Sequence, residues 1–258
     1  GTDALLDRPV VEYAGKDEPP GLDERRHGRP HPVHRLRGIG AAGGAIGRLP
    51  PGQADGKLDA LFNNGAYGQP GALEDLPTEA LKAQFNTNLF GWHHLIRQVL
   101  PPMLEAKEGR IVQNSSVLGL VAMKYRGAYN ASKFALEGYT DTLRLELEGS
   151  GVHISLIEPG PIDTRFRANA RDAFVRHIDP AQSRHQGAYR QTLTRLEKEG
   201  STSGFTLPSE ACIPPLLHAL QSKRPRHRYP VTLPTRLFSI LRRLLPSRWL
   251  DRILGKSV

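Results

Sequence analysis

Apolar and polar positions in the middle of the chain follow two different periods. Short apolar runs at 58–62, 110–116 and 152–157 each end in Asn, Ser or Pro, which is typical of buried strands followed by tight loops. Apolar residues also recur at helical spacing over 78–101 and 127–149. Strands that alternate with helices of this length predict βαβ units and a parallel sheet.

The two ends of the chain have a different texture. Residues 1–55 are rich in Gly, Pro, Arg and His and show neither the strand period nor the helix period, so they are not typical of a folded unit. After Thr164 the pattern predicts polar helical segments, a strand over 229–233 and a basic amphipathic helix over 235–254. A chain of 258 residues is expected to hold one α/β domain, at 56–258, behind an atypical, non-native or disordered segment.

Net charge and cysteine content exclude some classes of protein but do not identify a function. The formal net charge of +9 suits nucleic acid, an anionic membrane surface or a phosphorylated cofactor. Cys212 is the only cysteine, so an internal disulfide is excluded, and no metal site is expected because no second ligand lies at metal-binding spacing. No apolar run approaches the roughly 20 residues that span a bilayer, and no signal-peptide core is present. We therefore expect a soluble protein of the reducing cytoplasm.

Candidate chemistry gathers where the predicted strands end. In a parallel sheet, ligands bind outside the carboxyl ends of the strands, and polar or glycine-rich turns follow each strand at 63–66, 115–116 and 158–161. Downstream, Tyr129 and Lys133 are four residues apart on one helix face. An ammonium beside a phenol stabilises the phenolate and lowers its pKa, which makes the pair a proton donor and acceptor. Alone, such a pair is also common on solvated helix surfaces.

Four further motifs accompany this pair: the Asn-Asn-Gly-Ala turn at 63–66, a helix Asn, a Ser thirteen residues before the Tyr, and the Pro-Gly-Pro-Ile-Asp-Thr loop at 159–164. Taken together, the motifs resemble the short-chain dehydrogenase/reductase family. The resemblance is close over 56–165 and leans towards the branch that includes 17β-hydroxysteroid and retinol dehydrogenases and related aldehyde reductases. It implies a Rossmann-type doubly wound parallel sheet, NAD or NADP as cofactor, and interconversion of a hydroxyl and a carbonyl group on an apolar alcohol, ketone or aldehyde. The sequence does not choose between NAD and NADP.

The resemblance also implies roles for the catalytic residues. Tyr129 is the acid/base and Ser116, rather than Ser115, binds the substrate carbonyl. Lys133 tunes the tyrosine and holds the nicotinamide ribose, while Asn88 holds a water that links Lys133 to solvent. Ser115 is expected to be a loop hydroxyl bonded to backbone. Cofactor contacts are implied for Tyr129 and Lys133, for Asn63, Asn64, Gly65 and Ala66 beside the adenosine, and for Pro159, Gly160 and Thr164 at the nicotinamide carboxamide.

The N-terminal segment departs from the family pattern. The Thr-Gly-x-x-x-Gly-x-Gly turn that receives the pyrophosphate is missing, so the first strands are expected to be absent or disordered. The stretch 38–43 matches the generic dinucleotide fingerprint, but no apolar strand precedes it, and we discount it. The composition of 1–55 is what out-of-frame translation of a GC-rich gene gives. We expect this segment not to be the native N-terminal half and the chain to bind NAD(P)H poorly; a genuine variant N-terminus is the alternative.

The basic helix over 235–254 has two interpretations. Packing over the substrate cleft or at the interface of a homo-oligomer is favoured over contact with a membrane surface. Nucleic-acid binding is not expected, because no aromatic stacking platform lies beside the arginines. For the whole chain, the expected function is that of an NAD(P)-dependent oxidoreductase. The alternative is an inactive remnant with a binding or membrane-surface role.

Overall fold

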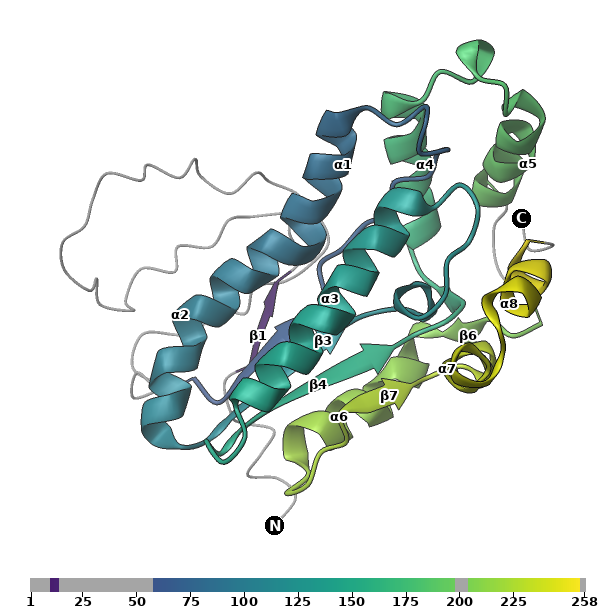
Figure 1. Cartoon of the computed structure of the whole chain (residues 1–258). Coiled ribbons are helices and arrows are strands. Elements are labelled where there is room, and N and C mark those ends of the chain that lie inside the picture. The colour runs from purple at the N-terminus through teal and green to yellow at the C-terminus, as the bar shows by residue number, and fades with distance from the viewer. Residues whose placement is uncertain (1–9, 14–57, 198–203, 256–258) are drawn as a thin grey trace, which may run out of the picture.

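A five-stranded parallel sheet forms the centre of the computed structural model, which describes residues 10–13, 58–197 and 204–255 (Figure 1). From one edge to the other, the strands are β1 (Val10–Tyr13), β2 (Ala60–Asn63), β3 (Gly109–Asn114), β4 (Val152–Glu158) and β7 (Arg228–Pro230). Each strand pairs in parallel with the next one across the sheet. The α/β, doubly wound fold class is therefore confirmed.

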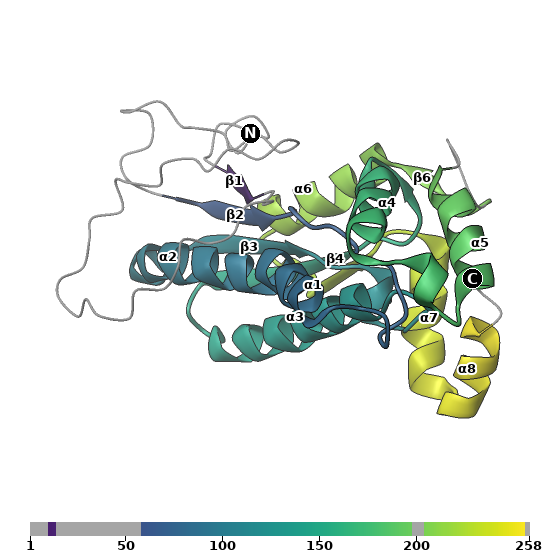
Figure 2. The same cartoon turned by 90° about the horizontal axis from the view of Figure 1, so that it is seen from above.

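Helices cover both faces of this sheet, as the view from above shows (Figure 2). On one face lie α1 (Thr78–Phe85), α2 (Gly91–Ala106) and α3 (Gly127–Glu146), and on the other lies α6 (Ile213–Gln221). Apolar side chains fill both interfaces, because parallel strands must bury both of their faces. The α2–α3 side of the core comprises Leu61, Ile96, Val99, Met103, Ile111, Leu143, Leu147, Val152 and Ile154, and the α6 side comprises Val112, Ile157, Ala219 and Tyr229.

Additional elements lie beyond the carboxyl end of β4. They are β5 (Ile162–Asp163), paired with β6 (Leu207–Pro208), then α4 (Phe166–His177) and α5 (Gln186–Glu197), and finally α7 (Leu233–Leu244) and α8 (Ser247–Leu254). Short 3₁₀ turns occur at Val117–Gly119, Pro180–Gln182 and Ser209–Cys212. No helix in the described ranges is long and apolar enough to cross a membrane.

Strand β1 was not expected, because no element was predicted before residue 56. Val10–Tyr13 pairs in parallel with Ala60–Asn63, so one strand precedes β2. Four residues are too few to show a period in a polar neighbourhood, and such a strand is stabilised by its partner rather than by its own pattern. The glycine-rich stretch at 38–43 lies outside the described residues.

The helix predicted over 78–101 is longer and less regular than expected. A π-helical turn, η3 (Asn86–Phe90), joins α1 to α2, and α2 continues through Pro101 to Ala106. An internal proline removes a backbone hydrogen bond and ordinarily costs a helix about 3 kcal/mol. In α2, Val99 and Met103, on either side of the prolines, are buried in the core, and this packing outweighs the local preference to stop.

The single basic helix predicted over 235–254 is two helices. Pro246 separates α7 from α8, because it has no N–H to continue the ladder of α7. The strand predicted over 229–233 is shorter than expected and occupies 228–230. The helix predicted over 127–149 ends at Glu146.

Candidate active site

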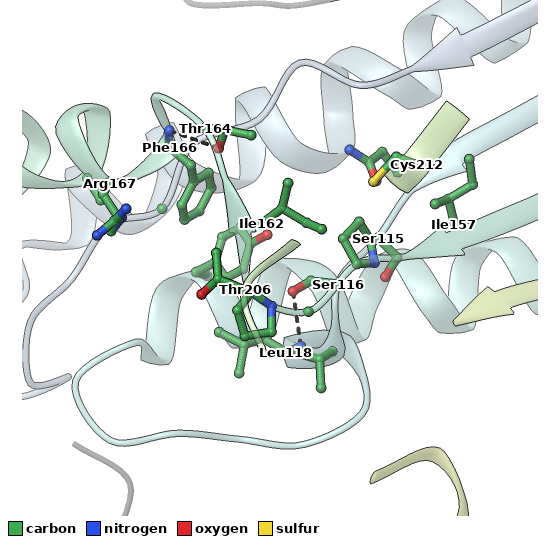
Figure 3. A pocket seen from close by; sticks show the side chains of 18 of the residues that line it. Ser115, Ser116, Leu118, Ile157, Ile162, Thr164, Phe166, Arg167, Thr206 and Cys212 are labelled. Carbon is green, nitrogen blue, oxygen red and sulfur yellow. Dashed lines mark hydrogen bonds between the residues drawn. The ribbon is translucent and has the colours of Figure 1, made fainter. Parts of the chain in front are cut away.

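A cavity of about 680 Å³ opens where β2, β3 and β4 end (Figure 3). Its wall includes residues from the turns that follow these strands, which is where a parallel sheet places its ligands. Six of the residues predicted for the site line it: Asn64, Ser116, Tyr129, Pro159, Gly160 and Thr164.

Tyr129 and Ser116 meet at this cavity. Tyr129 is in the first turn of α3 and Ser116 caps the 3₁₀ turn after β3, where its Oγ accepts from the Leu118 amide at 3.1 Å (Figure 3). Burial raises the pKa of Tyr129 to about 12, and a hydrogen bond with the Ser116 side chain opposes this rise. The phenol therefore keeps its proton at neutral pH.

Lys133 lies one helical turn after Tyr129 and is almost fully buried. Its Nζ donates to the carbonyl of Asn114 at 2.6 Å and lies 4.6 Å from the centre of the Trp92 ring and 5.7 Å from that of Tyr129. Burial lowers the pKa of Lys133 to about 7, and the carboxylate of Glu137 partly opposes this. In the cofactor-free structure burial raises the pKa of Tyr129 and lowers that of Lys133, so the predicted lowering of the Tyr129 pKa by Lys133 stays a prediction.

Glu137 and Arg228 form a charged cluster behind the lysine. Glu137 Oε1 accepts a short hydrogen bond from Ser115 Oγ, and Glu137 Oε2 pairs with the guanidinium of Arg228. The same guanidinium binds Glu158 at 2.6 Å and Asp141 at 2.7 Å. Burial raises the pKa of both Glu137 and Glu158, in the latter case to about 7. Ser115 is thus bonded to a carboxylate and not, as expected, to backbone.

Asn88 is completely buried in the π-helical turn. Its amide nitrogen donates to the Tyr67 carbonyl and to Ser132 Oγ, each at 3.1 Å, and its oxygen accepts from the Tyr67 amide. These bonds attach the loop after β2 to the helix that carries Tyr129 and Lys133. None of them involves Lys133 itself, so the predicted water link stays a prediction.

The Asn-Asn-Gly-Ala turn divides into structural and cavity-facing parts. Asn63 is buried and donates to Gln113 at 3.1 Å, and the Gly65 carbonyl accepts from the Trp92 indole at 3.0 Å. Only Asn64 of the four lines the cavity, where its Oδ1 accepts from Asn114 Nδ2. The adenosine contacts predicted for Asn63, Gly65 and Ala66 therefore stay predictions.

The loop after β4 is held against α7. A Cβ atom at Gly160 would lie 2.1 Å from Thr232 Oγ1, so only glycine allows this approach. The Pro159 carbonyl accepts from the Val117 amide at 2.7 Å, and Thr164 Oγ1 accepts from the Phe166 amide at 3.3 Å (Figure 3). These bonds fix the loop as one wall of the cavity.

The rest of the wall is mostly apolar and comes from four helices and a loop. Phe166 packs edge-on against Tyr129 with ring centres 5.2 Å apart. The other apolar lining residues include Leu118, Met123, Ala170, Leu196, Ile213, Leu216 and Phe238. The cavity thus combines a small polar floor at Ser116 and Tyr129 with walls that suit hydrocarbon.

The residues present fit the nicotinamide end of a dinucleotide. Asn114 Oδ1 is buried at the cavity without a hydrogen-bond partner among the described residues, and the Lys133 ammonium, which carries three protons, uses one of them on the Asn114 carbonyl. Lys133, Asn114 and the 159–164 loop would hold the nicotinamide riboside beside Tyr129. The described residues include no glycine-rich turn that would receive the pyrophosphate.

Glu137, Arg228 and Trp92 belong to the surroundings of Lys133 but were not predicted as site residues from the sequence. Glu137 follows Lys133 by four residues, so its place on the same helix face was available as a signal. Arg228 comes from β7, which is far away in the sequence, and its partners are determined by the pairing of β4 with β7. No pattern within the sequence predicts the contacts of Arg228 with these acids.

Comparisons with known proteins agree with this geometry. A family model described as short chain dehydrogenase matches residues 52–174. The chain is 39% identical over 237 residues to the uncharacterized oxidoreductase YbbO of Escherichia coli K12, a match that covers 88% of this chain and 82% of that protein. It is 32% identical over 202 residues to the probable short-chain type dehydrogenase/reductase VdlC of Helicobacter pylori, with coverage of 76% and 69%.

A solved structure gives the same result. The crystal structure of a short-chain dehydrogenase/reductase from Burkholderia phymatum in complex with NAD superposes with a TM-score of 0.59 at 29% sequence identity, and covers 78% of this chain and 69% of that one. Sequence, fold and site geometry thus lead to one conclusion: the chain belongs to the short-chain dehydrogenase/reductase family.

Proposed function

We propose that this oxidoreductase transfers hydride between NAD or NADP and a hydroxyl/carbonyl pair on an apolar small molecule, with Tyr129 as the acid/base. The observation that carries the proposal is the hydroxyl pair of Tyr129 and Ser116 at the cavity, with Lys133 one turn away on the same helix. The relative from Burkholderia phymatum binds NAD, which supports a nicotinamide cofactor.

The mechanism follows from the proton each group holds. When bound beside Tyr129, a nicotinamide would supply the hydride that reduces a carbonyl carbon, or would take up the hydride that an alcohol carbon loses. As a carbonyl is reduced, its oxygen gains negative charge, and Ser116 and Tyr129 stabilise that charge by hydrogen bonds. Tyr129 then gives its proton to the oxygen. Burial keeps the phenol protonated at neutral pH, which is the form that can donate a proton to the oxygen of a carbonyl.

Lys133 and Asn114 would position the cofactor relative to Tyr129. With the cofactor bound, an ammonium at Lys133 would hold the ribose hydroxyls, and its positive charge would stabilise the phenolate of Tyr129 after proton transfer. The bond from Lys133 to the Asn114 carbonyl fixes the position of Nζ relative to the end of β3. The apolar walls at Leu118, Phe166 and Leu216 hold the remainder of the substrate and exclude water.

A matched pair of serine variants tests the proposal. The purified chain is incubated with saturating NADH or NADPH and a panel of apolar aldehydes and ketones, and cofactor oxidation is followed by absorbance. We expect turnover on apolar carbonyls, with kcat reduced about 100-fold in Ser116→Ala because one oxyanion donor is lost. Ser222→Ala, in the loop after α6, is the control and should be unchanged. Equal rates for both variants, or no oxidation with any carbonyl, would overturn the proposal.

A further inference from the structure

An apolar stripe runs along the exposed side of α7. Leu233, Leu237, Ile240 and Leu244 follow one another at intervals of four, three and four residues, which places them on one helix face. Each is between 50 and 73% exposed. A soluble helix ordinarily turns such a face to the core, so a four-residue stripe in solvent requires an explanation.

The core-facing side of α7 is already occupied by other residues. Phe238 packs with Leu118 and Tyr129 in one apolar cluster, and Thr235 is fully buried beside Thr232. The expectation that this segment covers the cleft therefore accounts for one side of the helix only. The exposed stripe is left over after that packing.

Helix α8 repeats the arrangement. Leu250 and Leu254 join the same cluster as Tyr129, whereas Trp249 and Ile253, four residues apart, are 60% and 43% exposed. Figure 1 shows α7 and α8 together at one edge of the molecule, beside the carboxyl end of β4. Tryptophan is the side chain most typical of the boundary between hydrocarbon and water.

The charges around these apolar residues are almost all positive. Between residues 233 and 254 there are five arginines and a single acidic residue, Asp251. Arg243 and Arg248 are exposed and have no ion-pair partner among the described residues. Arginines beside an exposed apolar stripe are the signature of a helix that lies in the interface of an anionic bilayer. The five arginines are Arg236, Arg242, Arg243, Arg248 and Arg252.

A second copy of the chain is the competing occupant, and the charge distribution argues against it. A two-fold contact through α7 and α8 would bring both sets of five arginines together, with one aspartate on each side to compensate. Like charges brought together at an interface oppose association, whereas an anionic surface is complementary to this face.

From this face we propose that α7 and α8 dock the protein on the surface of a membrane rich in anionic lipid, without crossing it. The stripe Leu233, Leu237, Ile240 and Leu244, with Trp249 and Ile253, enters the interface, and the arginines contact lipid phosphates. Pro234 and Phe238 on the other side of α7 line the cavity. If the proposed function holds, an apolar substrate enters the site from the lipid side.

Vesicle flotation of the full chain tests the proposal. Wild-type protein is mixed with vesicles of phosphatidylcholine alone or with phosphatidylglycerol added, and the bound fraction is measured at low and physiological salt. We expect binding to the anionic vesicles that weakens as salt increases. Leu244→Glu removes an apolar contact and should lower the partition coefficient; Arg243→Glu with Arg248→Glu should lower it on the order of 25-fold, at about fivefold per basic residue.

Matched controls lie on other elements. Leu145→Glu replaces a comparably exposed leucine on α3, and Arg97→Glu with Arg224→Glu makes the same change in net charge away from α7. Both controls should bind as wild type does. NADPH oxidation without vesicles should be unchanged in all variants, so a failure of the docking proposal is distinct from a failure of the proposed function.

Three outcomes would overturn the proposal. The first is absence of the wild-type protein from the anionic vesicle fraction. The second is equal loss of binding in the α7–α8 variants and the controls, which would indicate non-specific attraction by net charge. The third is a dimer, detected by light scattering, that Leu244→Glu dissociates while vesicle binding is absent, because the stripe would then be a subunit contact.

Discussion

Tyr129 is the residue on which the proposed chemistry depends most directly. In the proposed mechanism its phenol supplies the proton and is not needed to hold the cofactor, so Tyr129→Phe should abolish turnover and leave cofactor affinity within a few-fold. Initial rates at saturating cofactor and a fluorescence titration of NADPH measure the two quantities. Tyr139→Phe is the control, because Tyr139 is on the same helix but binds His93 instead. Retention of more than about a tenth of the activity in Tyr129→Phe would exclude the assignment.

Lys133 should affect both chemistry and stability. Lys133→Met is expected to weaken turnover and cofactor binding together, because one ammonium would serve both Tyr129 and the ribose. Lys82→Met, at an exposed position of α1, should change neither.

In the cofactor-free protein, the folded pKa of Lys133 is about 7 and its ordinary value is 10.5. Between these values the unfolded chain holds a proton that the folded chain does not, so wild-type stability should rise with pH through that range.

Urea unfolding at pH 6 and pH 10 measures this effect. Lys133→Met removes the buried charge, so its stability advantage over wild type should be largest below pH 7, by roughly 4 kcal/mol before the lost Asn114 contact is subtracted, and should shrink towards pH 10. The same advantage at both pH values would show that Lys133 is not held with a depressed pKa.

Glu137 should position the charge of Lys133. Its carboxylate raises the pKa of Lys133 against the effect of burial, so Glu137→Gln should lower that pKa further. The pH above which cofactor affinity falls should then move down, while affinity at low pH is kept. Titrations of NADPH across pH measure the midpoint, and Glu79→Gln on α1 is the control. An unchanged midpoint with uniformly weaker affinity would indicate a purely structural role.

At the scale of elements, Arg228 joins β7 to β4 and α3. Its guanidinium pairs with the buried Glu137 and Glu158 and with the partly exposed Asp141, so Arg228→Met would leave two buried acids without a counter-charge. Breaking a buried pair typically costs 3–5 kcal/mol; because the Arg228 side chain is 26% exposed, we expect about 2–3 kcal/mol. Urea denaturation of Arg228→Met beside the exposed Arg224→Met measures the difference. Equal stability of the two variants would contradict the inference.

The same scale shows what a sequence pattern can predict. Strands β2, β3 and β4 were predicted from short apolar runs that end in turn residues, and helix α3 from apolar residues at helical spacing. Two predictions about proline were wrong. The helix predicted to end at Pro101 continues through Pro101 and Pro102, because core packing outweighs the local preference. The helix predicted to continue through Pro246 is interrupted there. The π-helical turn that buries Asn88 leaves no periodic signal at all.

For the molecule as a whole, the sequence indicated several of the residues that line the cavity, while their catalytic and cofactor roles stay predictions. Ser116, Tyr129, Asn64 and the 159–164 loop line one cavity, as the resemblance implied. The electrostatics were not predictable, because burial shifts the pKa values of Tyr129 and Lys133, and α7 and α8 contribute to the apolar cluster that contains Tyr129. Those helices are remote in the sequence, and only the fold places them over the site.

The N-terminal segment is where prediction and structure differ most. Strand β1 pairs with β2, and the match to YbbO covers 88% of the chain, more than 56–258 alone account for. Both observations indicate that part of 1–55 resembles the corresponding part of the family's sequences and adds a strand to the sheet. The missing Thr-Gly-x-x-x-Gly-x-Gly turn is a separate matter, because that turn supplies the amides and helix N-terminus that bind pyrophosphate.

The chain should therefore hold the nicotinamide half of the cofactor better than the rest. Lys133, Asn114 and the 159–164 loop remain to bind the nicotinamide riboside, whereas no family-type turn receives the pyrophosphate among the described residues. We expect weak binding of NADPH, within a few-fold of that of reduced nicotinamide mononucleotide, which lacks the adenosine half. Fluorescence titrations of both compounds measure this, and Lys133→Met should weaken both equally. Micromolar binding of NADPH with much weaker binding of the mononucleotide would instead show that residues 1–55 provide a working pyrophosphate site of another sequence.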